Sequence, residues 1–151
     1  MTKLESIDRW LIEGPYQGLV DRSGKAPEWW VENAAIAMAV SAWVETALRG
    51  WSTQPFELFV TVVMSIFAAL VIAGARVKNG LPRLLGSQLI RHMVLVLTAI
   101  GWLGVMLRAH PLAVLSFANA AAYLSIWYFT ACKPPSNRKR KHMRLATVLS
   151  Q

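Results

Sequence analysis

The chain has 151 residues, of which 55% are hydrophobic and 16% charged, and its formal net charge is +8. Because soluble domains carry about a quarter charged residues, this composition disfavours a cytosolic globular protein and indicates an integral membrane protein. The high apolar content also excludes intrinsic disorder. A single cysteine, Cys132, excludes an intrachain disulfide.

The acidic residues are confined to the N-terminal third of the chain. All eight Asp and Glu residues precede residue 58, whereas the residues after it hold eleven Lys and Arg. Any reaction that needs a carboxylate as base or metal ligand must take it from this third. The three histidines are scattered singly, and neither a phosphate-binding glycine loop nor a Ser–His–acid set is present. We therefore predict a protein that is not an enzyme and that needs no metal and no cofactor.

Residues 1–28 are predicted to form a cytoplasmic N-terminal segment. Within it, residues 2–13 predict a short amphipathic helix, and Gly14-Pro15 is expected to end that helix. The apolar residues that recur at helical spacing are Leu4, Ile7, Trp10 and Leu11. Such a helix suits the cytoplasmic membrane surface, and docking onto a partner fits equally well.

Four apolar stretches lie in the region 29–132. A bilayer core about 30 Å thick requires roughly 20 mostly apolar helical residues, and each stretch approaches that length. The predicted spans are residues 31–48, 56–75, 89–107 and 112–132. Arg91, in the first turn of the third span, is expected to reach the lipid headgroups along its own methylene stem. The predicted fold class is all-α, with four transmembrane helices after a short amphipathic helix.

The distribution of basic residues predicts the orientation. With four spans, 14 of the 16 Lys and Arg residues lie on the side that holds both termini, and the other side keeps only Arg49 and Arg108. Because basic residues favour the cytoplasmic side, we predict an inner-membrane protein with both termini in the cytoplasm. A chain with three spans would place the N-terminal segment outside and break this asymmetry.

The segment 133–151 is predicted to be a basic cytoplasmic tail. Its densest cationic run contains Arg138, Lys139, Arg140, Lys141 and Arg144. Held at an anionic leaflet, each basic residue gains about 1 kcal/mol. Because no aromatic residue is interleaved with this run, we predict contact with anionic lipid headgroups and no nucleic-acid partner.

Glu45 is an acidic residue inside the first predicted span, one turn after Ser41. An acid at that place is by default a candidate functional residue, and one interpretation makes it the proton- or cation-coupled carboxylate of a small transporter. In the other interpretation Glu45 lies near the outer end of the span and pairs with Arg49 at the i, i+4 spacing. Glu57, in the first turn of the second span, complements the helix dipole.

Two stripes on the later spans are candidate contact surfaces. Small residues, which let helices approach closely, recur in the second and third spans as Thr61, Ser65, Ala69, Ala73, Gly101 and Gly104. They fit either packing within the chain or self-association into a ring. Polar residues share one face of the fourth span: Ser116, Asn119, Tyr123 and Thr130. This face fits either a hydrogen-bonding seam between helices or a wettable surface in an oligomer.

A small chain with several short, weakly polar spans and a Lys/Arg-rich C-terminal tail resembles some phage holins. The resemblance covers the topology and the tail. It implies a non-enzymatic protein that self-associates and permeabilises the inner membrane. Two alternatives from other classes stay open: an accessory or assembly subunit that binds unlike subunits of a larger membrane complex, and a small proton-coupled transporter that uses Glu45.

Overall fold

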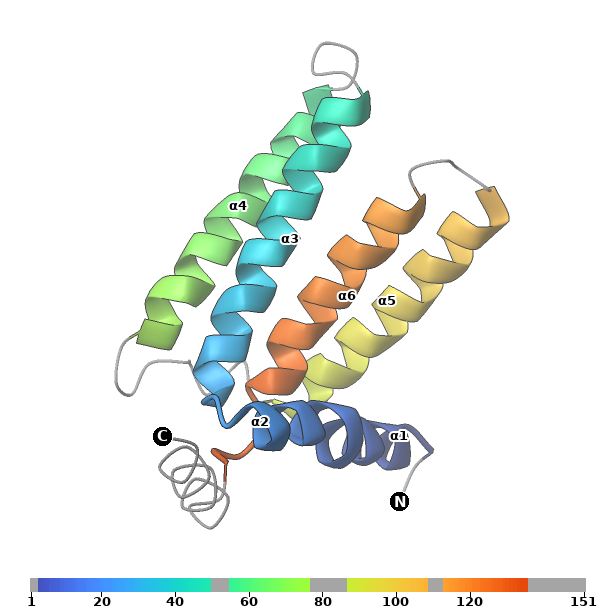
Figure 1. The fold of residues 1–151 in the computed structure, drawn as a ribbon. Helices are drawn as coiled ribbons and strands as arrows, with labels where there is room; N and C mark the ends of the chain where they lie inside the picture. The colour runs from blue at the N-terminus through green and yellow to red at the C-terminus, as the bar shows by residue number, and fades with distance from the viewer. Residues whose placement is uncertain (1–2, 50–54, 77–86, 109–112, 136–151) are drawn as a thin grey trace, which may run out of the picture.

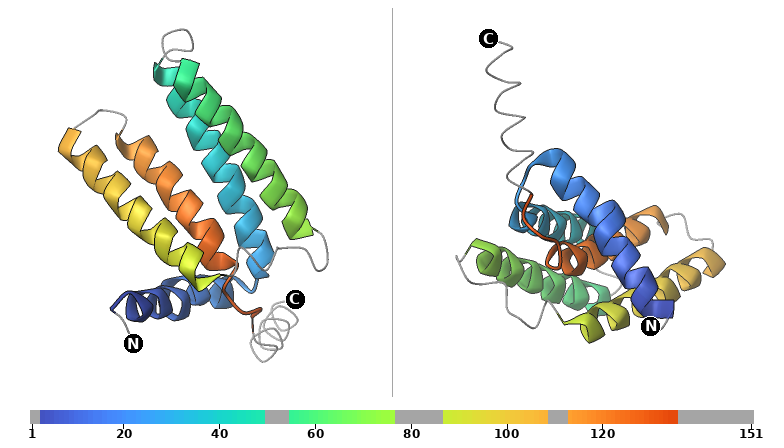
Figure 2. Two further views of the ribbon diagram at one scale, coloured as in Figure 1. Left: turned by 180° about the vertical axis from the view of Figure 1, so that it is seen from behind. Right: turned by 90° about the horizontal axis from the view of Figure 1, so that it is seen from below.

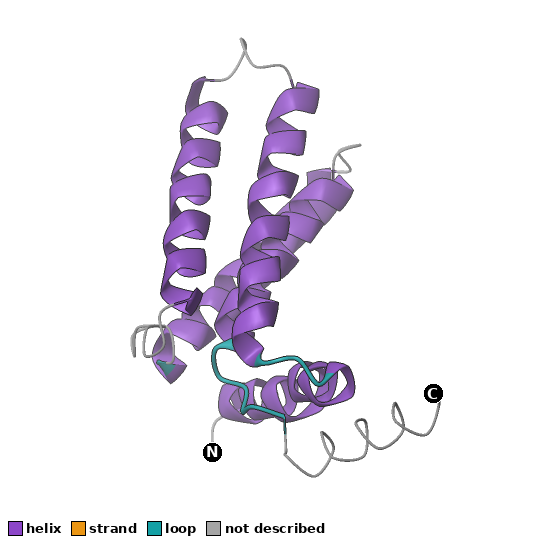
Figure 3. Cartoon of the chain, turned by 60° about the vertical axis from the view of Figure 1, so that its left-hand side comes forward, coloured by secondary structure: helices purple, strands orange, loops and turns teal. Residues whose placement is uncertain are grey.

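The computed structural model describes residues 3–49, 55–76, 87–108 and 113–135. Its elements, in chain order, are α1 (Lys3–Leu11), a π-helical segment η1 (Ile12–Tyr16), α2 (Gln17–Ser23), α3 (Pro27–Arg49), α4 (Pro55–Arg76), α5 (Gln88–Arg108) and α6 (Ala113–Phe129). No strand occurs among these residues, and loops and turns make up the rest (Figure 3). The all-α prediction is therefore confirmed for the described chain.

The four long helices lie in the order α4, α3, α6, α5 across the molecule (Figure 1). Helix α3 packs against both α4 and α6, and α5 packs against α6. The rings of Phe67 on α4 and Tyr123 on α6, 5.8 Å apart, also join those two helices. The segment α1–η1–α2 crosses one end of this arrangement (Figures 1 and 2). That end also holds the starts of α3 and α5 and the ends of α4 and α6.

Local sequence signals explain where α3 and α4 begin. Pro27 and Pro55 open them, and proline is favoured at a first helical position because its missing N–H needs no partner there. Before α3, Gly24 caps α2 in the left-handed conformation (φ 64°), and its N–H donates to the Val20 carbonyl at 3.1 Å. A residue with a side chain would be strained at this φ, so glycine permits the sharp change of direction into α3.

Three of the predicted spans lie inside α3, α4 and α5, but the fourth is shorter than predicted. Helix α6 ends at Phe129, whereas the prediction extends to residue 132. The N–H of Ala131 donates to the Tyr128 carbonyl, and the N–H of Cys132 donates to the Phe129 carbonyl. These i to i−3 bonds tighten the last turn and end the regular helix.

The N-terminal helix does not end at Gly14-Pro15, so that prediction is wrong. Helical geometry continues through η1 to Ser23. Proline cannot donate to the hydrogen-bond ladder, and its ring crowds the carbonyl four residues earlier. The wider hydrogen-bond spacing of a π turn accommodates Pro15 without breaking the helix.

The N-terminal segment docks on the chain's own bundle through both polar and apolar side chains, because Asp8 and Val20 are buried. Leu4, Ile7 and Trp10 are exposed, whereas Asp8 is only 3% exposed. Further along, Gln17 exchanges hydrogen bonds with the backbone of Lys133 after α6: Nε2 donates to the carbonyl at 3.1 Å, and Oε1 accepts from the N–H at 2.9 Å. Three of the four residues of the predicted apolar stripe therefore stay exposed, whereas Leu11 is half-buried and packs against the core.

The core consists of two clusters that share α6. The first joins α2, α3, α4 and α6 and contains Val20, Val31, Ala35, Met38, Ala68, Val71, Ile126, Phe129 and Cys132. The second joins α5 and α6 and contains Val94, Leu124, Trp127 and Tyr128. Tyr16 connects the N-terminal segment to both, because its ring stacks on Tyr128 at 5.1 Å and meets the edge of Phe129 at 4.9 Å.

Among the described helices, one is both long and apolar enough to cross a membrane. It runs over residues 58–76 of α4, and only 17% of its apolar window is buried inside the chain. The apolar stretches of α5 and α6, residues 88–104 and 114–129, are shorter. Helix α4 is therefore the described element that suits a bilayer most clearly.

Candidate functional site

A polar cluster around Glu45 lies at the end of the bundle opposite the N-terminal segment. Arg49 Nη2 donates to Glu45 Oε1 at 2.5 Å, which is the i, i+4 pair expected from the sequence. Ser116 Oγ on α6 donates to the same oxygen at 2.7 Å. The carboxylate therefore connects α3 to α6.

A small pocket of about 200 Å³ adjoins this cluster between α3, α4 and α6. Glu45, Arg49 and Asn119 line it together with hydroxyl and apolar side chains. The structure thus brings Asn119 of the predicted polar stripe to the same place as Glu45. Ser41 is not part of the Glu45 cluster, because its hydroxyl donates to the Met38 carbonyl of its own helix at 3.0 Å.

The remaining polar-stripe residues lie towards the other end of α6. The ring of Tyr123 packs against Phe67 and Trp127, and the hydroxyl of Thr130 donates to the Trp127 carbonyl at 2.7 Å. The stripe is therefore divided between the Glu45 cluster and the aromatic core. At the Glu45 end, a guanidinium and a hydroxyl both hold one carboxylate, which favours a clamp between α3 and α6 over an unpaired proton carrier.

A double-mutant cycle measures the coupling free energy between Ser116 and Glu45, which joins α6 to α3. We expect Ser116→Ala to lower the free energy of unfolding by about 1 kcal/mol, because it removes a hydrogen bond to a charged group. In a Glu45→Ala background the same substitution should have little effect. Unfolding in mixed micelles gives the four values. Ser41→Ala is the matched control, and equal losses from Ser116→Ala with and without Glu45 would contradict the coupling.

Two residues of the predicted small-residue stripe face α3. Thr61 is buried, and its hydroxyl lies 2.6 Å from that of Thr46. Ser65 accepts a hydrogen bond from the indole N–H of Trp43 at 2.8 Å. Both therefore contribute to close packing between α3 and α4.

The other residues of the small-residue stripe are placed differently, and the choice between packing and self-association stays open for them; they are Ala69, Ala73, Gly101 and Gly104. The two alanines are exposed, and Ala68 is buried in their place. Positions four apart drift by about 40° per step around a helix of 3.6 residues per turn, so the stripe rotates away from α3. A methyl group added at either glycine would find no atom within 4 Å, so neither glycine permits a close helix contact inside the chain.

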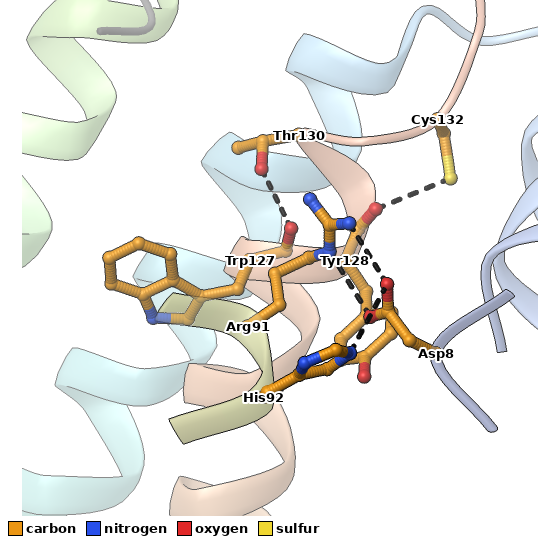
Figure 4. Close-up of polar contacts among 7 residues, drawn as sticks. All are labelled: Asp8, Arg91, His92, Trp127, Tyr128, Thr130 and Cys132. Carbon is orange, nitrogen blue, oxygen red and sulfur yellow. Dashed lines mark hydrogen bonds and ion pairs between the residues drawn. The ribbon is translucent and has the colours of Figure 1, made fainter. Parts of the chain in front are cut away.

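The sequence did not reveal a buried ion pair between α1 and α5 (Figure 4). Arg91 donates to both carboxylate oxygens of Asp8, from Nε at 3.2 Å and from Nη2 at 2.9 Å. The two residues are 3% and 7% exposed, and His92 Nε2 lies 3.9 Å from Asp8 Oδ2. Arg91 therefore does not reach for the headgroups as predicted, because the bidentate bond to Asp8 keeps it buried.

The environment of Asp8 sets the sign of its pKa shift. Burial by itself raises the pKa of the carboxyl, but the hydrogen bonds and the positive charge of Arg91 more than offset this effect. The Tyr128 hydroxyl and His92 lower the pKa further, to a smaller degree. The net pKa of Asp8 lies below its usual value, so the ionised form is favoured in the docked state.

This depressed pKa predicts how docking depends on pH. The contribution of Asp8 is fully present above the pKa of an unfolded aspartate, about 3.9, and is lost as the pH falls through the lower folded value. A spin label at Ser6→Cys, in a Cys132→Ala background, should be less mobile at pH 7 than at a pH below the folded pKa of Asp8. An Asp8→Asn control should lack this transition. Unchanged mobility of the wild-type label across the range would contradict the prediction.

Several predicted residues lie outside what the structure describes. These are the tail residues Arg138, Lys139, Arg140, Lys141 and Arg144, together with the side chain of Glu57. Cys132 is described, and it is buried, with its thiol donating to the Tyr128 carbonyl at 3.4 Å. In the described ranges, no group of three or more His, Cys, Asp or Glu side chains could hold a metal ion.

No family model, no curated protein and no solved structure matches the chain. Its function is therefore argued from its own residues.

Proposed function

We propose that the chain is a four-span protein of the inner membrane with both termini in the cytoplasm. The alternating directions of α3, α4, α5 and α6 support this arrangement, since they assign one end of the bundle to the N-terminal segment and the residues after α6. Of the described basic residues, that end holds seven, and the other end holds only Arg49 and Arg108; the seven are Lys3, Arg9, Arg22, Lys25, Arg76, Arg91 and Lys133. This asymmetry is the one that a cytoplasmic location favours.

The exterior of α4 and α5 supports contact with lipid. Both helices expose large apolar side chains along their length: Phe56, Phe59, Ile66, Leu70, Leu89, Leu97, Ile100, Leu103, Met106 and Leu107. Soluble monomers rarely expose contiguous apolar patches larger than a few hundred Å². In a bilayer, acyl chains would surround these side chains, so their apolar surface would not be exposed to water.

Within that membrane, we propose that the protein self-associates and makes the bilayer permeable, in the manner of a holin. The observation that carries this proposal is the exposure of Ala69 and Ala73 on α4. Both alanines are exposed in the described chain, and small residues on a lipid-facing helix let a second helix approach closely. Gly101 offers a similar place on α5.

A second candidate function, as an accessory subunit of a larger complex, is favoured by a different observation. Leu4, Ile7 and Trp10 stay exposed on α1, at the cytoplasmic end of the bundle. They could dock onto an unlike chain as well as onto the membrane surface. The paired state of Glu45 gives the transporter alternative less support.

Inducing expression in bacterial cells and following the membrane potential with a voltage-sensitive dye tests permeabilisation. We expect the potential to collapse once the protein accumulates in the membrane. An undisturbed potential at high membrane levels would contradict the proposal. Mild-detergent extraction and native mass measurement then separate a homo-oligomer from a complex with unlike chains in fixed ratio, which would support the accessory role.

A further inference from the structure

An apolar groove of about 690 Å³ opens between α3 and α5, above α6. Ala34 and Leu95 lie in its two walls, and Ala122 and Phe129 form part of its floor. Leu19 and other residues of the N-terminal segment close its cytoplasmic end. The groove is therefore open along one side and covered at one end.

Three polar side chains along the groove, those of Asn33, Ser125 and Tyr16, are hydrogen-bonded within the chain. The amide of Asn33 donates to the Trp29 carbonyl at 2.7 Å. The hydroxyl of Ser125 donates to the Ala121 carbonyl at 2.8 Å and lies 3.3 Å from the hydroxyl of Tyr16. The indole N–H of Trp102 is buried and has no hydrogen-bond partner among the described residues. The groove thus presents a mostly hydrocarbon surface.

The position of the groove fits one leaflet. On α3 its lining extends over residues 30–37 and on α6 over residues 122–129, which is about 10 Å of helix in each case. Both stretches lie near the ends of the helices that hold the N-terminal segment. If the proposed membrane placement holds, these two stretches lie within the inner half of a bilayer core about 30 Å thick, and on α5 the lining extends from Leu95 to Trp102, just past the middle of that helix.

Two exposed cations flank the covered end. Arg22 follows the groove residue Leu19 by three positions on α2, so both lie on one face of that helix. The Lys25 ammonium lies 5.6 Å from the ring centre of Trp29, which packs edge-to-face on the groove residue Trp30. The positive charges of Arg22 and Lys25 therefore lie where a lipid headgroup would be, next to an apolar surface that suits an acyl chain.

We propose that this groove binds one acyl chain of an anionic phospholipid of the inner leaflet, with its headgroup beside Arg22 and Lys25. A helix from a second copy fits less well, because residues of the N-terminal segment line the end through which it would continue. An acyl chain is attached to its headgroup at that end of the groove, so it does not have to pass the N-terminal segment. The inference rests on the proposed membrane placement.

Native mass measurement of the purified chain, with phosphatidylglycerol or phosphatidylcholine added, tests the site. We expect one phosphatidylglycerol bound per chain, retained about tenfold more than phosphatidylcholine, a difference of about 1.4 kcal/mol. Ala34→Phe with Ala122→Phe should fill the groove and abolish retention of either lipid. Arg22→Ala with Lys25→Ala, which changes only exposed side chains, should remove the preference for phosphatidylglycerol and keep the bound chain.

Matched controls distinguish this site from general lipid adhesion. Arg9→Ala removes an exposed cation on α1, and Leu70→Ala removes an exposed apolar side chain on α4. Both should leave lipid retention unchanged. The proposal would be overturned if the Ala34→Phe, Ala122→Phe variant still retained lipid. It would also be overturned if this variant lost a homo-oligomer while the lipid stayed bound. Because lipid retention is measured on purified protein, it does not depend on whether expression depolarises cells.

Discussion

Arg91→Ala is expected to lower the free energy of unfolding by about 3 kcal/mol. The substitution leaves the Asp8 carboxylate buried without the guanidinium that satisfies both of its oxygens. Removing one partner of a buried pair costs more than the pair itself contributes, because the remaining charge stays desolvated. Unfolding in mixed micelles measures the change, and proteolysis of residues 3–23 reports the release of the N-terminal segment.

Two further variants test whether the loss of stability is specific to the ion pair of Asp8 and Arg91. Arg9→Ala removes an exposed arginine from α1 and should change the free energy of unfolding by no more than about 0.5 kcal/mol. Asp8→Leu with Arg91→Met replaces both charges by apolar groups of similar size and should recover most of the loss. If Arg91→Ala matched the Arg9→Ala control, the ion pair could not be what docks α1.

If the proposed self-association through α4 is right, Ala69→Phe with Ala73→Phe is expected to give a monomer and to abolish the proposed depolarisation. Both positions are exposed on α4, so the larger rings should not disturb the fold but should keep a second helix at a distance. We expect the dissociation constant to rise at least tenfold, or about 1.4 kcal/mol. Native mass measurement and the dye assay in expressing cells give the two readouts.

Leu70→Phe is the matched control for this surface. It places the same ring on the same helix, at a position that is already large and 67% exposed. We expect its mass and its depolarising activity to equal those of the wild type. An unchanged oligomer in the Ala69 and Ala73 variant would remove α4 from the interface. If the wild-type protein instead copurified with unlike chains in fixed ratio, the accessory role would be favoured.

The long helices could be predicted because their signals are local. Span length, absence of charge and an initial proline define α4, and the predicted boundaries 56–75 lie within one residue of the helix Pro55–Arg76. The pair of Glu45 and Arg49 is local too, since it lies four residues apart on one helix. Such features depend on neighbours in the sequence, which the sequence shows directly.

The features that could not be predicted depend on contacts between distant segments. Asp8 and Arg91 are 83 residues apart, and the charge pattern placed both near the cytoplasm without indicating that they meet. Whether Ala69 faces α3 or lipid depends on how α4 is rotated about its axis, which a spacing of four does not fix. A signal for the ion pair was nevertheless present, because an arginine inside an apolar span is costly unless it is paired.

Cysteine accessibility tests the four-span arrangement most directly. In a Cys132→Ala background, single cysteines replace Ser6, Ser52, Ser87 and Ala109, and a membrane-impermeant maleimide is applied to intact spheroplasts and then to opened ones. The arrangement predicts labelling at positions 52 and 109 from outside, and at positions 6 and 87 only after opening. Labelling of position 6 from outside, or of position 52 only after opening, would contradict it.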